Sequence, residues 1–101
     1  MSTKRESDVL TRPKKALKKP GKYKVLLHND DYTTMEFVVS VLMSVFNRDQ
    51  ERAFEIMMHV HNAGMGVAGI YTKEIAETKT AKTVELARKY DFPLECTMEP
   101  E

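Results

Sequence analysis

The sequence has few of the residues that form crosslinks or metal clusters. Among its 101 residues there is one cysteine and no tryptophan. A lone cysteine excludes an internal disulfide and a cluster of thiolate ligands, so we interpret Cys96 as a small buried strand residue. Apolar runs are also short. None approaches the roughly 18 residues that a membrane-spanning helix needs, and no apolar signal core follows the N-terminal charges. We therefore expect a soluble cytoplasmic protein with no membrane partner.

Positive charge is concentrated at the N-terminus, although the formal net charge of the chain is only +1. Residues 1–22 carry eight Lys and Arg against two Asp and Glu, whereas residues 23–101 carry eight against thirteen, so the two parts have charges of +6 and −5. Few apolar side chains accompany the basic ones, and such a segment cannot bury enough surface to offset its ordering entropy. We predict a flexible basic extension over residues 1–22 and one folded core domain over residues 23–101.

A basic arm of this kind could instead bind nucleic acid, because clustered lysines neutralise phosphates. Stacking on bases needs aromatic side chains, however, and none precedes Tyr23. We therefore expect no nucleic-acid partner and keep this function as an alternative.

Three short apolar segments, at residues 23–27, 67–71 and 94–98, are predicted to be strands. The first and the last alternate apolar and polar residues with the two-residue period of a strand. Pro93 precedes the last segment and blocks the continuation of a helix into it.

Helix start and stop signals separate these strands. The capping box Thr33–Glu36 predicts a helix that runs to residue 46 or 47. Asp49 can cap a second helix, which Gly64 ends in the left-handed conformation. Thr72 can cap a third helix. The inner face of this third helix is expected to carry Ala76, Thr83, Ala87 and Tyr90.

The predicted order of elements is therefore strand, helix, helix, strand, helix, strand. Three short strands alone would leave an apolar sheet face in water, and three amphipathic helices can cover that face. We predict an α+β fold in which a three-stranded antiparallel sheet packs against three helices. No internal repeat is present, so function is expected in a local site.

The first candidate site is the tripeptide Asn29-Asp30-Asp31, which lies between the first predicted strand and the first predicted helix. The tripeptide alone is also typical of a turn whose side chains bind their own backbone. Met35 and Val38 follow it, one helical turn apart. Polar acceptors beside an apolar hollow suit an amphiphilic ligand.

The second candidate is formed by Met57, Val60 and His61, whose spacing places them on one stripe of the second predicted helix. His61 could equally be a satisfied core residue. His59 and His61 cannot clamp one metal ion between them, because residues two apart on a helix point about 200° apart. One histidine with the two loop carboxylates leaves a metal-dependent enzyme as an alternative.

Asp31 and His61 could form an acid-base pair, but no activated nucleophile motif, phosphate-binding glycine loop or dinucleotide fingerprint accompanies them. We therefore expect no catalytic residue, no metal and no cofactor.

Longer stretches of the sequence resemble ClpS adaptors. YKVLLHNDDYTTMEFV at residues 23–38 is similar to the strand and loop that characterise this family, and the likeness continues through MMHVHNAGMGVAGIYT, IAETK and FPLECTMEPE. The resemblance covers residues 23–101, and its motifs are specific in combination. It implies a fold like the C-terminal domain of the ribosomal stalk protein. It also implies a non-catalytic protein that recognises N-degrons, which are destabilising N-terminal residues, for the ClpAP protease.

By this resemblance, the substrate's α-amine is bound by Asn29, Asp31 and His61, with Asp30 adding negative charge. An α-ammonium has three donors, which a carboxylate and two further acceptors can satisfy. Met35 is expected to act as a gatekeeper that rejects β-branched Ile and Val. The implied hydrophobic pocket for Leu, Phe, Tyr or Trp consists of Leu27, Met35, Val38, Met57, Val60 and Leu94.

The resemblance also implies a partner, the N-terminal domain of ClpA, which would dock on Glu74 and Lys79. These two residues could otherwise be an ordinary exposed charge pair on a helix. The basic extension is expected to be engaged by the ClpA motor during delivery, and the protein is expected to be a monomer.

Two positions depart from the family pattern. Thr34 stands where the family usually has Pro, which we expect to loosen the helix start slightly. His28 stands where many members have an apolar residue, and a polar ring beside the pocket could shift the preference among Leu, Phe, Tyr and Trp.

Overall fold

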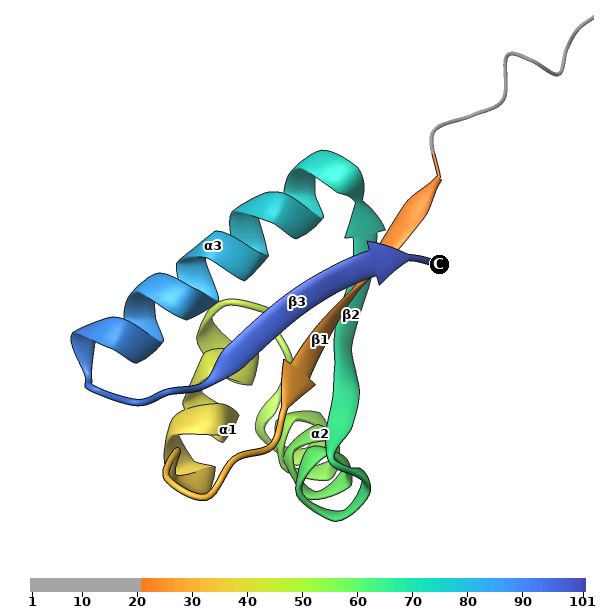
Figure 1. Ribbon diagram of the computed structural model, residues 1–101. Helices are drawn as coiled ribbons and strands as arrows, with labels where there is room; N and C mark the ends of the chain where they lie inside the picture. The colour runs from red at the N-terminus through yellow and green to blue at the C-terminus, as the bar shows by residue number, and fades with distance from the viewer. Residues whose placement is uncertain (1–20) are drawn as a thin grey trace, which may run out of the picture.

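The computed structural model describes residues 21–101. The predicted flexible extension therefore lies almost entirely outside the described residues. The elements are β1 (Lys22–His28), α1 (Met35–Ser44), α2 (Gln50–Ala63), β2 (Met65–Thr72), α3 (Lys73–Lys89) and β3 (Glu95–Pro100) (Figure 1). This order confirms the predicted α+β fold. Within residues 21–101, no helix combines the length and the apolar character that crossing a membrane requires.

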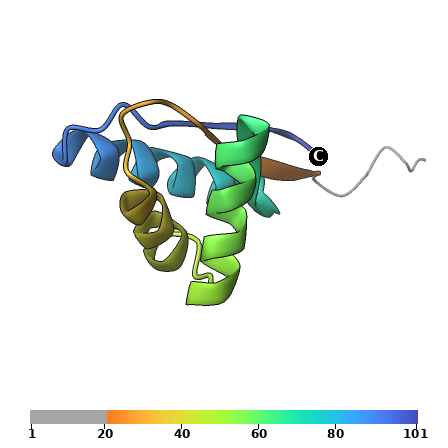
Figure 2. The same ribbon diagram turned by 90° about the horizontal axis from the view of Figure 1, so that it is seen from below.

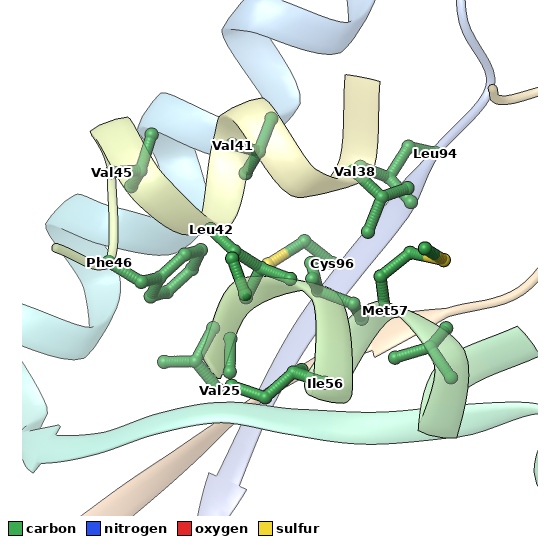
Figure 3. Close-up of a cluster of buried hydrophobic side chains, with 14 of the residues drawn as sticks. Val25, Val38, Val41, Leu42, Val45, Phe46, Ile56, Met57, Leu94 and Cys96 are labelled. Atoms are coloured by element: carbon green, nitrogen blue, oxygen red, sulfur yellow. The ribbon is translucent and has the colours of Figure 1, made fainter. Parts of the chain in front are cut away.

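β1 lies in the middle of the sheet, whose strand order is β2-β1-β3, and both neighbouring strands run antiparallel to it. The three helices cover one face of this sheet, as the view from below shows (Figure 2). Between them and the sheet lies one apolar core, in which Val25 and Leu27 of β1 are fully buried (Figure 3). Leu42 of α1 and Cys96 of β3 belong to the same core, which confirms the interpretation of Cys96.

The pairing of β1 with β2 contains one irregularity. Val25 pairs with Gly69 and Leu26 with Val67, so Ala68 is an extra residue on β2. Arg48 donates from Nε and Nη2 to the Ala68 carbonyl, at 3.0 and 2.8 Å. The guanidinium thereby satisfies the carbonyl of the bulged residue and ties β2 to the connection between α1 and α2.

The first helix begins one residue later than predicted. The cap is Thr34, whose hydroxyl accepts from the Phe37 N–H at 3.1 Å. Thr33 was the predicted cap, but its hydroxyl donates to Asp30 instead. Thr34 is thus a functioning cap residue rather than a poor substitute for Pro at the first helical position. The helix also ends earlier, at Ser44.

The other helix boundaries agree better with the prediction. Asp49 accepts from the Arg52 N–H at 2.8 Å, and Gly64 ends α2 with φ 93°, as predicted. Thr72 occupies the cap position of α3 without a side-chain capping bond. Tyr90 is wrong as an inner-face residue, because it follows the last turn of α3 and is 56% exposed.

Lys79 is not the exposed helical charge that its sequence position suggests. Its Nζ donates to the Val45 carbonyl at 2.6 Å and lies 5.2 Å from the centre of the Tyr71 ring and 5.9 Å from that of Phe46. Val45 is the C-cap of α1, where a positive charge is favourable. Lys79 therefore joins α3 to the end of α1.

We predict that Lys79→Met lowers the free energy of unfolding by about 1–2 kcal/mol, because the substitution keeps the apolar stem but removes the charged donor. Urea denaturation measures this loss. Lys82→Met, an exposed position on the same helix, is the matched control and should change stability little. Equal midpoints for the two variants would contradict the anchoring role of Lys79.

Candidate functional site

The loop between β1 and α1 is shaped by one carboxylate. Asp30 Oδ1 accepts from the backbone N–H groups of Tyr32 and Thr33, at 2.8 and 2.7 Å, and Oδ2 accepts from the Thr33 hydroxyl at 2.8 Å. Burial raises the pKa of the Asp30 carboxyl, but these hydrogen bonds outweigh burial and hold it below its ordinary value of 3.8. Asp30 is thus charged at neutral pH and organises the loop through these hydrogen bonds.

The start of this loop is tied to the end of α2. The Asn29 N–H donates to the Gly64 carbonyl at 2.9 Å, and Gly64 adopts the left-handed conformation that turns the chain from α2 into β2. His61 lies in the last turn of α2. The hydrogen bond therefore brings the polar loop and His61 to the same end of the molecule.

A pocket of about 260 Å³ opens where the loop, α1 and α2 meet. Its apolar wall comes from Val38, Met57 and Val60, which are only 7, 4 and 3% exposed. The more exposed Met35, at 42%, also borders it. The polar part of the wall consists of Asn29, Asp30, Asp31, Thr33 and His61. The pocket is therefore apolar on one side and rich in acceptors on the other.

The structure brings together most of the residues that the sequence singled out. Both the tripeptide 29–31 and the stripe of Met57, Val60 and His61 line this one pocket. Leu27 and Leu94 do not line it. They are 0 and 3% exposed and belong to the buried core, in the same cluster as Val38 and Met57. Figure 3 shows Leu94 beside Val38 in this core.

Two positions near the pocket differ from expectation. Thr33 lines the pocket, although sequence reasoning assigned its hydroxyl to helix capping. Its position close after the acidic tripeptide was the one feature of the sequence that could have indicated a place in the pocket wall. His28 is absent from the pocket wall, and its Nε2 pairs with the Thr97 hydroxyl on β3 at 2.8 Å. The proposed influence of His28 on side-chain preference therefore has no direct contact behind it.

The pocket's chemistry suits a cation attached to an apolar group. Asp30 and Asp31 supply negative charge, and Asn29 and His61 supply further polar atoms. Among residues 21–101, no group of three or more His, Cys, Asp and Glu is placed to hold a metal ion. His59 borders a different hollow, beside Arg52 and Val67, as its spacing from His61 predicts.

The predicted partner-binding residues lie away from this pocket. Glu74 is exposed in the first turn of α3, directly after β2. The pocket is bordered by His61 in the last turn of α2, directly before this eight-residue strand begins, so it lies near the opposite end of β2.

Comparison with known proteins identifies the family. A model described as "ATP-dependent Clp protease adaptor protein ClpS" matches residues 18–97. The chain belongs to the ClpS family. A ClpS of Desulfatibacillum aliphaticivorans is 57% identical over 93% of this chain and 90% of its own length. A ClpS of Phenylobacterium zucineum is 56% identical over 92 and 85%, respectively.

A solved structure agrees with both the family and the fold. Agrobacterium tumefaciens ClpS2 bound to L-phenylalaninamide has 42% sequence identity and a TM-score of 0.80, covering 82% of this chain and all of that one. As a member of the ClpS family, the chain is a protease adaptor and not an enzyme.

We predict that Asp30→Ala lowers the free energy of unfolding by about 1–2 kcal/mol, because three hydrogen bonds to a charged group are lost. Asp31→Ala is the matched control, because the Asp31 carboxylate accepts no hydrogen bond from residues 21–101 and should change stability little.

The same pair of variants gives a pH test. A carboxyl whose pKa is lowered by folding stabilises the protein above its unfolded pKa, and this stabilisation disappears as the pH falls through the folded pKa. The stability difference between wild type and Asp30→Ala should therefore shrink below pH 3.8. A difference that is constant from pH 7 to pH 2 would contradict the assigned role.

Proposed function

We propose that this chain binds the N-terminal residue of substrate proteins, preferring Leu, Phe, Tyr and Trp, and delivers them to the ClpAP protease. One observation carries the proposal: acceptors on the loop and on His61 share a pocket with the buried apolar wall of Val38, Met57 and Val60. An N-terminal residue has a matching character, since its cationic amine and its side chain leave the same carbon atom.

The proposed amine site needs acceptors for three donors. The Asp31 carboxylate compensates the charge, and the Asn29 side-chain oxygen and a neutral His61 nitrogen accept the remaining hydrogen bonds. Asp30 contributes to this site by its negative charge and by the loop conformation that its own hydrogen bonds stabilise. An amine buried without such partners would bind weakly.

The ligand of the related structure supports the proposed ligand class. L-phenylalaninamide, bound by Agrobacterium tumefaciens ClpS2, has a free α-amine, a benzyl side chain and an amide in place of the carboxylate. It therefore imitates the first residue of a protein. Met35, at the rim of the pocket here, is proposed to contact the β-carbon and disfavour Ile and Val.

Delivery is proposed to use the other end of the molecule. Glu74, with the neighbouring surface of α3, would dock on the N-terminal domain of ClpA, and the basic N-terminal extension would be engaged by the motor. Lys79 would contribute mainly by holding α3 against α1, since its charge is already paired with the Val45 carbonyl. The distance of this surface from the pocket allows both partners to bind at once.

We predict that labelled peptides beginning with Leu, Phe, Tyr or Trp bind tightly and that matched peptides beginning with Ile, Val or Ala bind poorly. Asp31→Ala should weaken the Leu peptide by about 30-fold, because about 2 kcal/mol is lost when an ammonium loses its carboxylate. Fluorescence anisotropy measures these affinities.

An N-acetylated Leu peptide serves as the control for the amine, since acetylation removes its charge. Glu51→Ala, which removes an exposed carboxylate in the first turn of α2, controls for general loss of negative charge. Equal affinity for the acetylated and the free peptide would rule out amine capture.

For delivery, we predict that Glu74→Lys leaves peptide affinity unchanged and slows degradation of a Leu-initiated reporter by ClpAP at least about fivefold, because a reversed charge at an interface costs affinity. Deletion of residues 1–20 should show the same separation of binding from delivery. Degradation at the wild-type rate by both variants would refute the proposed docking surface and the role of the extension.

A further inference from the structure

A second hollow lies next to the pocket, along the seam between α1 and α2. It has a volume of about 400 Å³ and shares Met35 and Met57 with the pocket. Val39, Met43 and Phe54 supply most of the rest of its apolar lining. Met43 and Phe54 are 40 and 55% exposed, and neither contributes to the proposed binding of the first residue. We call this hollow the seam groove.

The seam groove leads away from the amine site. The seam groove is bordered neither by residues 29–31 nor by His61. Met35 and Met57 border both hollows, so the two hollows meet at these residues. An extended chain whose amine is held by the loop and whose first side chain fills the pocket therefore has a continuous apolar path into the seam groove.

The spacing along the seam groove fits an extended peptide. Its α1 residues Met35, Val39 and Met43 recur every four positions, so successive side chains lie about one turn, or roughly 5–6 Å, apart. In an extended chain, residues one and three point to the same face about 6.6 Å apart, and residue two points to the opposite face. A chain that leaves the pocket across Met35 and Met57 would thus place its third side chain over the seam groove.

We infer that the seam groove binds the side chain of the third residue of the substrate and favours an apolar one; this inference rests on the proposed function. Methionine side chains suit such a role, because they adapt to apolar groups of different shape. Glu36 borders the groove as well and disfavours an acidic side chain there. The adaptor would then bind the side chains of the first and the third residue of a substrate.

The test uses labelled peptides that begin Leu-Ser-X or Leu-X-Ser and are otherwise identical, with X as Leu, Ser or Asp. Wild-type protein should bind Leu-Ser-Leu about fivefold more tightly than Leu-Ser-Ser, as partial burial of one leucine side chain predicts. Leu-Leu-Ser should bind like Leu-Ser-Ser, and Leu-Ser-Asp should bind most weakly. Anisotropy titrations give each ratio.

Two variants locate the effect. Phe54→Ser and Met43→Ser should each reduce the advantage of Leu-Ser-Leu to below about twofold, with affinity for Leu-Ser-Ser unchanged. Ile75→Ser on α3, an apolar residue of similar exposure outside the groove, is the matched control and should keep the advantage. Circular dichroism verifies that all three variants fold.

The outcomes separate this inference from the proposed function. Tight binding of Leu-Ser-Ser without any preference for leucine at position three would overturn the inference and leave the first-residue pocket intact. An advantage that persists in both Phe54→Ser and Met43→Ser would also overturn it. Failure of every Leu-initiated peptide to bind would overturn the proposed function, and the inference with it.

Discussion

The hydrogen bond from the Asn29 N–H to the Gly64 carbonyl fixes the relation between two parts of the chain that are far apart in sequence. It joins the end of the central strand to the end of α2, and it forms because Gly64 adopts a conformation that costs other residues energy. Together with the pairing of His28 with Met65, this tie fixes the position of the acidic loop relative to His61. The pocket between them depends on the glycine as much as on the residues that line it.

The same loop shows how one carboxylate is separated in role from its neighbour. The Asp30 carboxylate accepts three hydrogen bonds, all from Tyr32 and Thr33 of the same loop. Asp31 keeps its carboxylate available at the pocket. Two adjacent residues of the same type therefore serve structure and proposed binding, and only the hydrogen-bond pattern distinguishes them.

Local signals were sufficient to predict much of this structure. Asp49 and Gly64 act within one helical turn of their own positions, so their sequence neighbours already define their roles. The sequence predicted Thr33 as the cap of the first helix, but its hydroxyl bonds to Asp30 and the adjacent Thr34 caps the helix instead. Lys79 gave no local signal, because its partner carbonyl at Val45 lies 34 positions away in the sequence.

The periodicity of the sequence could not distinguish pocket residues from core residues, for a similar reason. Val38, Met57 and Val60 are nearly as buried as Leu94, and all four share one contiguous cluster. What distinguishes the first three is contact with a hollow that only the tertiary arrangement creates. The pocket is thus an opening in the core itself, and its wall is held by the packing that stabilises the domain.

The Cys96 thiol is consistent with an adaptor that binds its ligands without covalent chemistry. Burial raises the pKa of the Cys96 thiol to about 11, and nearby threonine hydroxyls on α3 offset this only in part. The thiol is therefore neutral at physiological pH, and its burial at 7% exposure keeps it from solvent. The proposed selectivity would then rest on the shape of the pocket and the charge at its mouth, because the chain's one thiol packs as an apolar group in the core.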